Sequence, residues 1–316
     1  IGRNCSNITF ENITIEGGSD GNHGILDFKG HSSYPVHNIN LKNISIYNSS
    51  TSGIRCAHVH NLELENIICS STNSTKKLAA IHLHDCKYII ANHIKTTLNK
   101  GTNETIGLKI EGCKDAKLTN ILSSSNEDNN TGAYTKSIVI TDSYNIQLDH
   151  IESTNTQNAH CGIGIINSKH TTLKNTIICN NHSGLSAPYS GICIQGSDSI
   201  VINNCSISNC SSKTDFNGIL CDASTCTDIF LKNVEISANS AADGSFTGVN
   251  LDLSEFIILK NMIVSQNKST HNTYGLKTTN NTKNLFCNNC QFVYNKSTTT
   301  SHDTIVSGVY INGTVG

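Results

Sequence analysis

Charged and imidazole side chains recur at matching places in successive repeats of this sequence, and these residues are the best suited to chemistry. The largest set comes from neighbouring repeats and comprises Arg55, His82, His84, Lys109 and Glu111. We expect Arg55, His82 and Lys109 to form a cationic column on the outer face of stacked strands. His84 would then lie beside Glu111 in the next column. Adjacent strands bring such neighbours to within about 5 Å of each other.

This arrangement could bind and transform an acidic sugar. A cationic column attracts carboxylate groups, and a His–Glu pair can transfer a proton. We therefore predict catalytic roles for His82, His84, Lys109 and Glu111, and a substrate-binding role for Arg55. The alternative is that these side chains form the ordinary solvated face of a sheet, because exposed strand positions are usually polar.

Asp222 and Asp252 form a second pair, at matching places in adjacent repeats. Two neighbouring carboxylates can share a proton or hold Ca²⁺, which prefers oxygen ligands. We predict that these aspartates are the metal-binding residues of the chain, with Ca²⁺ as the ion. No other cofactor is predicted.

The elements that position these residues are short strands in which apolar and polar side chains alternate. The pattern is clearest in segments 38–46, 228–236 and 256–264, each of which breaks at a central Asn and then resumes. We interpret each copy as two short strands joined by a tight turn, because Asn tolerates the left-handed backbone that such turns need. The central residue is Asn or His and recurs at Asn12, Asn43, Asn66, His93, Asn120, His150, Asn175, Asn204, Asn233, Asn261 and Asn289. The interval of roughly 23 to 31 residues is typical of a solenoid coil.

A third strand follows in each copy and begins with a small residue and an aliphatic one, as in Gly53-Ile54. Three short strands per repeat, about eleven repeats and no helical periodicity predict an all-β fold, a single-stranded right-handed parallel β-helix. Stacking would align the central residues into an internal Asn ladder whose amides bond from coil to coil. We predict one domain over residues 1–316, as a processed or trimmed part of a longer chain.

Composition narrows the classes of function. The net charge of −2 gives no electrostatic case for binding nucleic acid, and no apolar run approaches the length of a membrane span. The 14 Cys could form a disulfide framework, but Cys205, Cys287 and Cys290 replace aliphatic residues at inward positions. We therefore expect most of the cysteines to be buried thiols that pack as small hydrophobic groups.

The coil pattern resembles the pectate-lyase-like right-handed β-helix superfamily over essentially the whole chain. Within it, segment 23–55 is similar to part of a polygalacturonase in its His-Gly-Ile, Val-His-Asn-Ile and Ser-Gly-Ile-Arg sequences. That resemblance implies that His23 is the family's histidine and that His23 and Arg55 contact substrate.

A further resemblance is to surface passengers and adhesins, including polymorphic membrane proteins. Those proteins repeat an aromatic or aliphatic residue, two variable residues and Asn, followed by a glycine and aliphatic signal. Here Phe-Val-Tyr-Asn at 292–295 precedes Gly-Val at 308–309, and Val-Ser-Gln-Asn at 264–267 precedes Gly-Leu at 275–276. The resemblance implies a rigid rod displayed at a surface.

We therefore predict a non-catalytic structural or adhesive β-helical rod of a surface, a virion or a filamentous assembly. Scarce aromatics and absent Trp favour this interpretation, since sugar-binding grooves commonly use aromatic side chains. The alternative is a carbohydrate-active enzyme, a polysaccharide lyase or glycoside hydrolase, acting on an acidic polysaccharide. Expected partners are a polysaccharide or cell-surface glycan and further copies of the chain, assembled end to end or as a homo-oligomer. The expected location is extracellular or surface-associated, with an intracellular assembly as the alternative.

Overall fold

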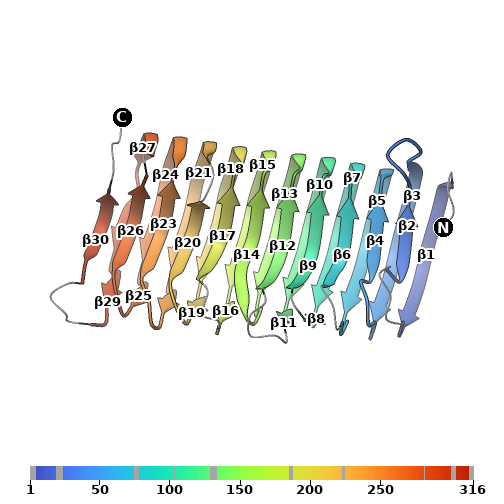
Figure 1. The fold of residues 1–316 in the computed structure, drawn as a ribbon, viewed down its shortest axis with the longest axis horizontal. Helices are drawn as coiled ribbons and strands as arrows, with labels where there is room; N and C mark the ends of the chain where they lie inside the picture. The colour runs from blue at the N-terminus through green and yellow to red at the C-terminus, as the bar shows by residue number, and fades with distance from the viewer. Residues whose placement is uncertain are drawn as a thin grey trace.

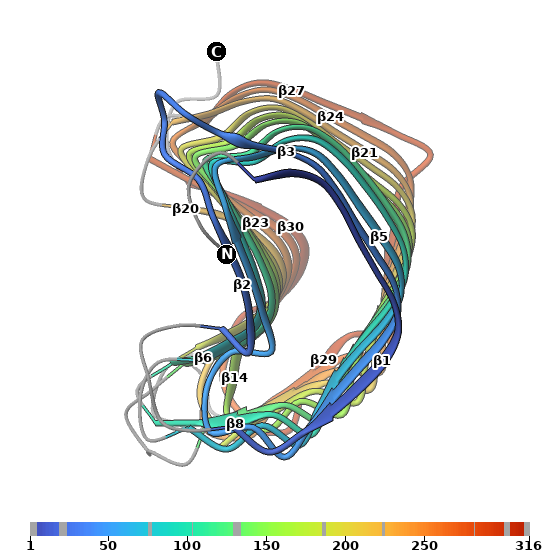
Figure 2. The same ribbon diagram turned by 90° about the vertical axis from the view of Figure 1, so that its right-hand side faces the viewer.

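The structure, a computed structural model, describes residues 5–18, 24–74, 78–102, 104–128, 134–184, 188–222, 225–280, 282–299 and 304–312. Its strands pair in parallel and lie side by side along the long axis of the molecule in chain order (Figure 1). Viewed along that axis, successive coils superimpose (Figure 2). The predicted all-β parallel β-helix is therefore confirmed. The described residues include no helix long and apolar enough to cross a membrane.

Two large sheets, which we call the long sheet and the short sheet, run the length of the solenoid, and two smaller sheets lie at a third edge. The long sheet contains β1 (Ser6–Glu16), β3 (Val36–Tyr47), β5 (Val59–Ser70), β7 (Lys87–Thr97), β10 (Lys114–Ser124), β13 (Tyr144–Thr154), β15 (Lys169–Cys179), β18 (Asp198–Ser208), β21 (Cys226–Ser237), β24 (Ser254–Ser265), β27 (Lys283–Asn288) and β28 (Gln291–Val293). The short sheet contains β2 (Leu26–Lys29), β4 (Ile54–Ala57), β6 (Leu78–His84), β9 (Glu104–Glu111), β12 (Tyr134–Thr141), β14 (Ala159–Ile166), β17 (Tyr189–Gln195), β20 (Phe216–Asp222), β23 (Phe246–Asp252), β26 (Thr273–Thr279) and β30 (Val306–Ile311). Two-residue strands pair at a third edge: β8 (Lys100–Gly101), β11 (Glu127–Asp128), β16 (His182–Ser183), β19 (Ser211–Ser212), β22 (Ser240–Ala241), β25 (Lys268–Ser269) and β29 (Lys296–Ser297).

The core lies between the long and the short sheet and is filled by the inward members of each alternating strand. In β3, for example, Leu41, Ile44 and Ile46 are fully buried, and Leu41 stacks on Leu64 of the next coil. The small residue near the start of each short strand is explained by the packing of the core. A side chain at Gly218 would place its Cβ 2.7 Å from the Ile236 side chain on the long sheet. The two sheets therefore approach too closely there for anything larger.

The long strands differ from the prediction in one respect. The alternating segments from β1 to β24 each form one continuous strand of the long sheet rather than two short strands joined by a turn, as in β3. Only the last described segment is divided, at Asn289, into the two strands β27 and β28. Its central Asn43 adopts a left-handed backbone with φ 53°, and so does Asn38 earlier in the same strand, with φ 54°. A single left-handed residue bends the strand without ending it, because hydrogen bonding to the neighbouring coils continues on both sides.

The predicted column of central Asn residues does form a hydrogen-bonded ladder, but its side chains face solvent. Asn43 Nδ2 donates to Asn12 Oδ1 at 2.8 Å, and Asn66 Nδ2 donates to Asn43 Oδ1 at 2.9 Å. The predicted internal position of this column is therefore wrong. At the bend the left-handed residue turns its side chain outward, a direction that the alternation of the sequence does not specify.

A separate Asn ladder is internal and lies at the turn that follows the long strands. Asn239 and Asn267 are fully buried, and Asn239 Nδ2 donates to Asn267 Oδ1 at 3.1 Å. Asn267 Nδ2 donates in turn to Asn295 Oδ1 at 2.8 Å. Asn267 and Asn295 are the final residues of the adhesin-like Val-Ser-Gln-Asn and Phe-Val-Tyr-Asn sequences. The recurrence of the final Asn of these motifs at an interval of one coil could have revealed the internal ladder from the sequence.

Candidate functional site

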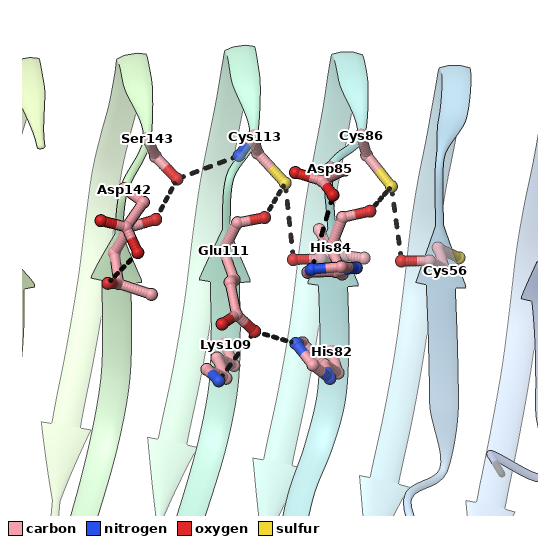
Figure 3. A network of polar contacts seen from close by, with 12 residues as sticks. Cys56, His82, His84, Asp85, Cys86, Lys109, Glu111, Cys113, Asp142 and Ser143 are labelled. Atoms are coloured by element: carbon pink, nitrogen blue, oxygen red, sulfur yellow. Dashed lines mark hydrogen bonds and ion pairs between the residues drawn. The ribbon is translucent and has the colours of Figure 1, made fainter. Parts of the chain in front are cut away.

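Side chains of β6 and β9 meet on the outer face of the short sheet. The register places His82 beside Lys109 and His84 beside Glu111, as the repeat pattern predicts. However, Glu111 Oε2 lies 2.8 Å from His82 Nε2 and 2.8 Å from Lys109 Nζ (Figure 3). Glu111 thus reaches diagonally to His82, which a long side chain can do across adjacent strands.

The predicted pairing of His84 with Glu111 is therefore not formed. His84 Nε2 instead lies 3.5 Å from Oδ2 of Asp85, the next residue in the chain (Figure 3). Asp85 begins the turn after β6 and has a left-handed backbone with φ 51°. The sequence pattern did not place this carboxylate, because it lies beyond the end of the alternating strand.

The half-buried position of the cluster shifts its pKa values. Burial, reinforced by the nearby Lys109 charge, lowers the pKa of His82 more than its hydrogen bond to Glu111 raises it. Burial would raise the pKa of Glu111, but the hydrogen bonds from Lys109 and His82 outweigh it, so this pKa lies below its ordinary value. Glu111 is therefore ionised at neutral pH and can only accept hydrogen bonds, so the neutral His82 ring donates through Nε2 and keeps a lone pair on Nδ1.

Arg55, one of the two residues predicted to bind substrate, lies on the N-terminal side of this cluster. Arg55 on β4 stands between Asp27 of β2 and His82 of β6 in one column of the short sheet. The structure thus brings Arg55 together with the cluster of His82, Lys109 and Glu111. His23 lies outside the described residues.

The two aspartates predicted to bind Ca²⁺ end β20 and β23 on a distant part of the short sheet. Asp252 Oδ1 accepts a hydrogen bond from Thr279 Oγ1 at 2.9 Å. Within the described part of the chain, neither Asp222 nor Asp252 belongs to a group of three His, Cys, Asp or Glu whose ligand atoms lie within 4.8 Å of one another. Calcium binding by this pair stays a prediction.

The long sheet carries a groove that sequence reasoning did not identify. We call it the long-sheet groove: it has a volume of about 770 Å³ and crosses strands β1, β3, β5, β7, β10 and β13. Outward side chains line it, including Asn38, Asn61, Tyr88, Ile90, Lys117 and Gln147. Tyr88 is 58% exposed and Ile90 is 61% exposed. A column of Asn residues before the central ones, such as Asn38 ahead of Asn43, was the signal that could have located this groove.

Cysteines contribute to packing rather than to a covalent framework. All 14 are free thiols in the structure, and most of them are buried. Cys86 and Cys113 lie in a column of small polar residues at the end of the short strands, above the cluster of His82 and Glu111 (Figure 3). Burial raises the pKa of Cys69 to about 12, so this thiol is not ionised at neutral pH. The expectation of buried thiols is confirmed for most of these residues.

Comparison with known proteins adds information about the fold. No protein-family model matches the chain, and no curated protein matches it at a significant level. Among solved structures, the A-module of a mannuronan C-5 epimerase from Azotobacter vinelandii is similar, with a TM-score of 0.50 and 11% identity over 98% of this chain and 91% of that chain. A surface protein and adhesin from Streptococcus pneumoniae has a TM-score of 0.36 and 11% identity over 98% of this chain and 91% of that chain. An alginate lyase from a Paenibacillus species has a TM-score of 0.31 and 13% identity over 97% and 90% of the two chains.

At these identities the likeness concerns the fold and not the activity. The stacking of parallel coils and the structural similarity to the epimerase module both indicate a parallel β-helix. The chain therefore has a parallel β-helix fold that is similar to the fold of the epimerase module.

Proposed function

We propose that the protein is a non-catalytic, adhesive β-helical rod that binds a glycan chain along the long-sheet groove. The observation that carries this proposal is the groove itself, which extends across six successive coils. A polysaccharide is a linear repeating ligand, so a surface built from repeating coils can offer it equivalent contacts at regular intervals.

Amide side chains give the groove its capacity for hydrogen bonding. Asn38 Nδ2 donates to Asn7 Oδ1 at 2.7 Å, and Asn61 Nδ2 donates to Asn38 Oδ1 at 2.8 Å. Each ladder bond uses one of the two N–H groups of an amide and one of the two lone pairs of its oxygen. The remaining donors and acceptors are held in fixed positions and match the hydroxyl groups of a sugar.

An exposed aromatic ring supplies the apolar contact that sugars require. Tyr88 occupies the place that Asn61 holds in the preceding coil and presents its ring beside Ile90. The charged residues that line the groove are Glu63, Asp115 and Lys117, so the lining has no excess of positive charge. A neutral glycan therefore suits this groove better than an acidic one. Such a rod would work at a surface or outside the cell, where glycans are displayed.

The test is a binding screen of neutral and acidic polysaccharides against the wild-type chain and Tyr88→Ala. We expect binding of a neutral glycan that weakens about threefold to tenfold in the variant, the range typical of one lost aromatic contact. Tyr294→Ala is the matched control, because Tyr294 is also exposed and has a φ of 56° against 57° for Tyr88. Absence of glycan binding, or equal binding by both variants and the wild type, would refute the proposal.

The cluster on the short sheet favours a second candidate function, acid–base catalysis on an acidic polysaccharide. Its specific support is the His82–Glu111–Lys109 arrangement next to Arg55, which combines a neutral imidazole with cationic groups. Under this proposal His82 removes a proton, and Arg55 and Lys109 bind substrate carboxylates. A cleavage screen on acidic polysaccharides, with and without Ca²⁺, would compare the wild type with His82→Gln and Lys109→Met. Cleavage that both substitutions abolish would favour the enzyme over the rod.

A further inference from the structure

The turns that follow the short strands place one left-handed residue in every coil of the region around β4, β6 and β9. These residues are His58, Asp85 and Gly112, with φ values of 53°, 51° and 63°. Glycine and aspartate are frequent at such positions, whereas a bulkier side chain needs a reason to be there. The effect of His58 in this column is to bring its imidazole against the carboxylate of Asp85 and the ring of His84.

The nitrogen and oxygen atoms of these three side chains converge. His58 Nδ1 lies 3.7 Å from Asp85 Oδ2, and His84 Nε2 lies 3.5 Å from the same oxygen. All three ligand atoms lie within 4.8 Å of one another, and no other group of three His, Cys, Asp or Glu in the described ranges meets that condition. The imidazole rings contact edge to face, with centroids 5.7 Å apart.

The distances between these nitrogen and oxygen atoms fit the ligands of one metal ion better than they fit hydrogen bonds between the side chains. N–H···O hydrogen bonds measure about 2.7–3.2 Å between nitrogen and oxygen, which is shorter than either separation here. In a tetrahedral zinc site with bonds of about 2.0–2.1 Å, neighbouring ligand atoms lie about 3.3–3.4 Å apart. The two histidines and the aspartate therefore need only small movements to coordinate one ion.

The neighbouring coil leaves room for the carboxylate. A Cβ at Gly112 would lie 2.2 Å from Asp85 Oδ1, so only glycine at this position lets Asp85 keep its orientation. The site is open on its outer side, since the side chains of His58, His84 and Asp85 are 24%, 35% and 42% exposed. Water can therefore complete the coordination. Burial also lowers the pKa of His58, which favours the neutral imidazole that binds metals.

We infer that His58, His84 and Asp85 form a binding site for a divalent transition metal, with Zn²⁺ as the expected ion. Two imidazole nitrogens and one carboxylate oxygen are ligands that Zn²⁺ accepts, whereas Ca²⁺ and Mg²⁺ prefer all-oxygen sites. The site differs in position and chemistry from the Asp222–Asp252 pair and from the long-sheet groove. It depends on neither proposed function.

The experiment is a titration of the chelator-treated full chain with Zn²⁺ by calorimetry, repeated with Co²⁺ to record the visible absorption of the bound ion. We expect one ion per chain. Asp85→Asn and His58→Asn should each weaken binding by at least about tenfold. Asparagine suits the left-handed backbone at both positions, so the turn is preserved. The matched controls are Asp142→Asn and His93→Asn, because Asp142 and His93 also have left-handed backbones, with φ values of 50° and 54°.

The outcomes separate the inference from its alternatives. Binding that survives in both ligand variants, or that is lost equally in the controls, would show that other surface groups hold the ion and would overturn the inference. No binding to the wild type would overturn it as well. His84→Gln provides a further variant of a proposed ligand, at a residue that lies in strand β6. Circular dichroism of every variant checks that the β-helix is intact.

Discussion

Glu111 joins the polar face of the short sheet into one unit, because one carboxylate oxygen accepts from Lys109 on its own strand and from His82 on the neighbouring strand. Hydrogen bonds to a charged group are stronger than neutral ones, but this carboxylate is about 30% exposed, which reduces their net effect.

We predict that Glu111→Gln lowers the free energy of unfolding by about 1 kcal/mol. The neutral amide weakens both hydrogen bonds and leaves the Lys109 charge without its carboxylate partner. Urea unfolding followed by circular dichroism measures the change. Glu152→Gln, at an exposed position of β13, serves as the control and should change stability little. A loss of equal size in the two variants would show that the cluster adds no stability of its own.

His160 gives the fold a dependence on pH. Burial, together with the nearby Lys136 charge, lowers its pKa below the ordinary 6.5, while a hydrogen bond to the Pro188 carbonyl opposes the shift. Below pH 6.5 the unfolded chain therefore binds this proton more readily than the folded chain. The free energy of unfolding therefore decreases as the pH falls from 6.5 toward the lower pKa that His160 has in the folded chain.

The prediction is that His160→Gln loses less stability than the wild type between pH 7.5 and pH 5.5. Other histidines titrate in both proteins, so the difference between the two pH profiles isolates His160. Urea midpoints at the two pH values provide the measurement. Parallel profiles would mean that His160 is protonated equally well in the folded and the unfolded chain.

At the scale of elements, the long strands carry two Asn ladders with different physical roles. The outer ladder bends the strands and faces solvent, where its amides can also bond to water. The side chains of the inner ladder form hydrogen bonds with backbone N–H and C=O groups at the buried turn. Asn239, for instance, accepts from the Cys210 N–H at 2.9 Å and donates to the Ile207 carbonyl at 3.0 Å.

Asn239→Ala should therefore lower the free energy of unfolding by about 3 kcal/mol, since it leaves several buried polar groups without partners. The comparison is Asn233→Gly in the outer ladder, where glycine accepts the left-handed backbone and water replaces the lost amide. That change should cost about 0.5 kcal/mol. Thermal and urea unfolding of both variants test this difference. If the two substitutions lower the free energy of unfolding equally, the burial of the inner ladder does not increase its contribution to stability.

At the scale of the whole molecule, the described strands of the two large sheets pair with strands of the adjacent coils. Each long strand pairs with the strands before and after it, as β15 does with β13 and β18. The strands at the two ends are more exposed than these central ones, and neither β1 nor β27 contains a buried residue. The free energy of unfolding of such a solenoid is approximately the sum of a contribution from each coil and a contribution from each interface between adjacent coils.

Hydrogen exchange should accordingly be slowest in the amides of β13, β15 and β18 and fastest in β27 and β30. Opening of the end coils exposes little further surface, whereas opening of the centre requires neighbours on both sides to separate. Exchange followed by mass spectrometry of peptides measures the gradient. Uniform protection along the chain would indicate that the rod unfolds as one cooperative unit.

The sequence by itself determined the coil. Alternation of apolar residues, as in Leu41, Ile44 and Ile46, and the recurrence of a small residue near the start of each short strand specify which side chains face inward and which coil follows which. These features are local and repetitive, so a pattern reveals them. The sequence also placed His82, Lys109 and Glu111 on one face of the sheet, because strand alternation fixes the side of each residue.

Only the tertiary structure decided how those side chains meet. Glu111 bonds to His82 rather than to His84, and His84 lies with His58 and Asp85, because the turn beyond the strand adds groups that alternation does not order. The same holds for the ladders: Asn43 and Asn239 are the same residue type, yet the direction of the bend makes one exposed and the other buried. Side-chain reach and bend direction depend on the stacked neighbours, which a linear pattern does not contain.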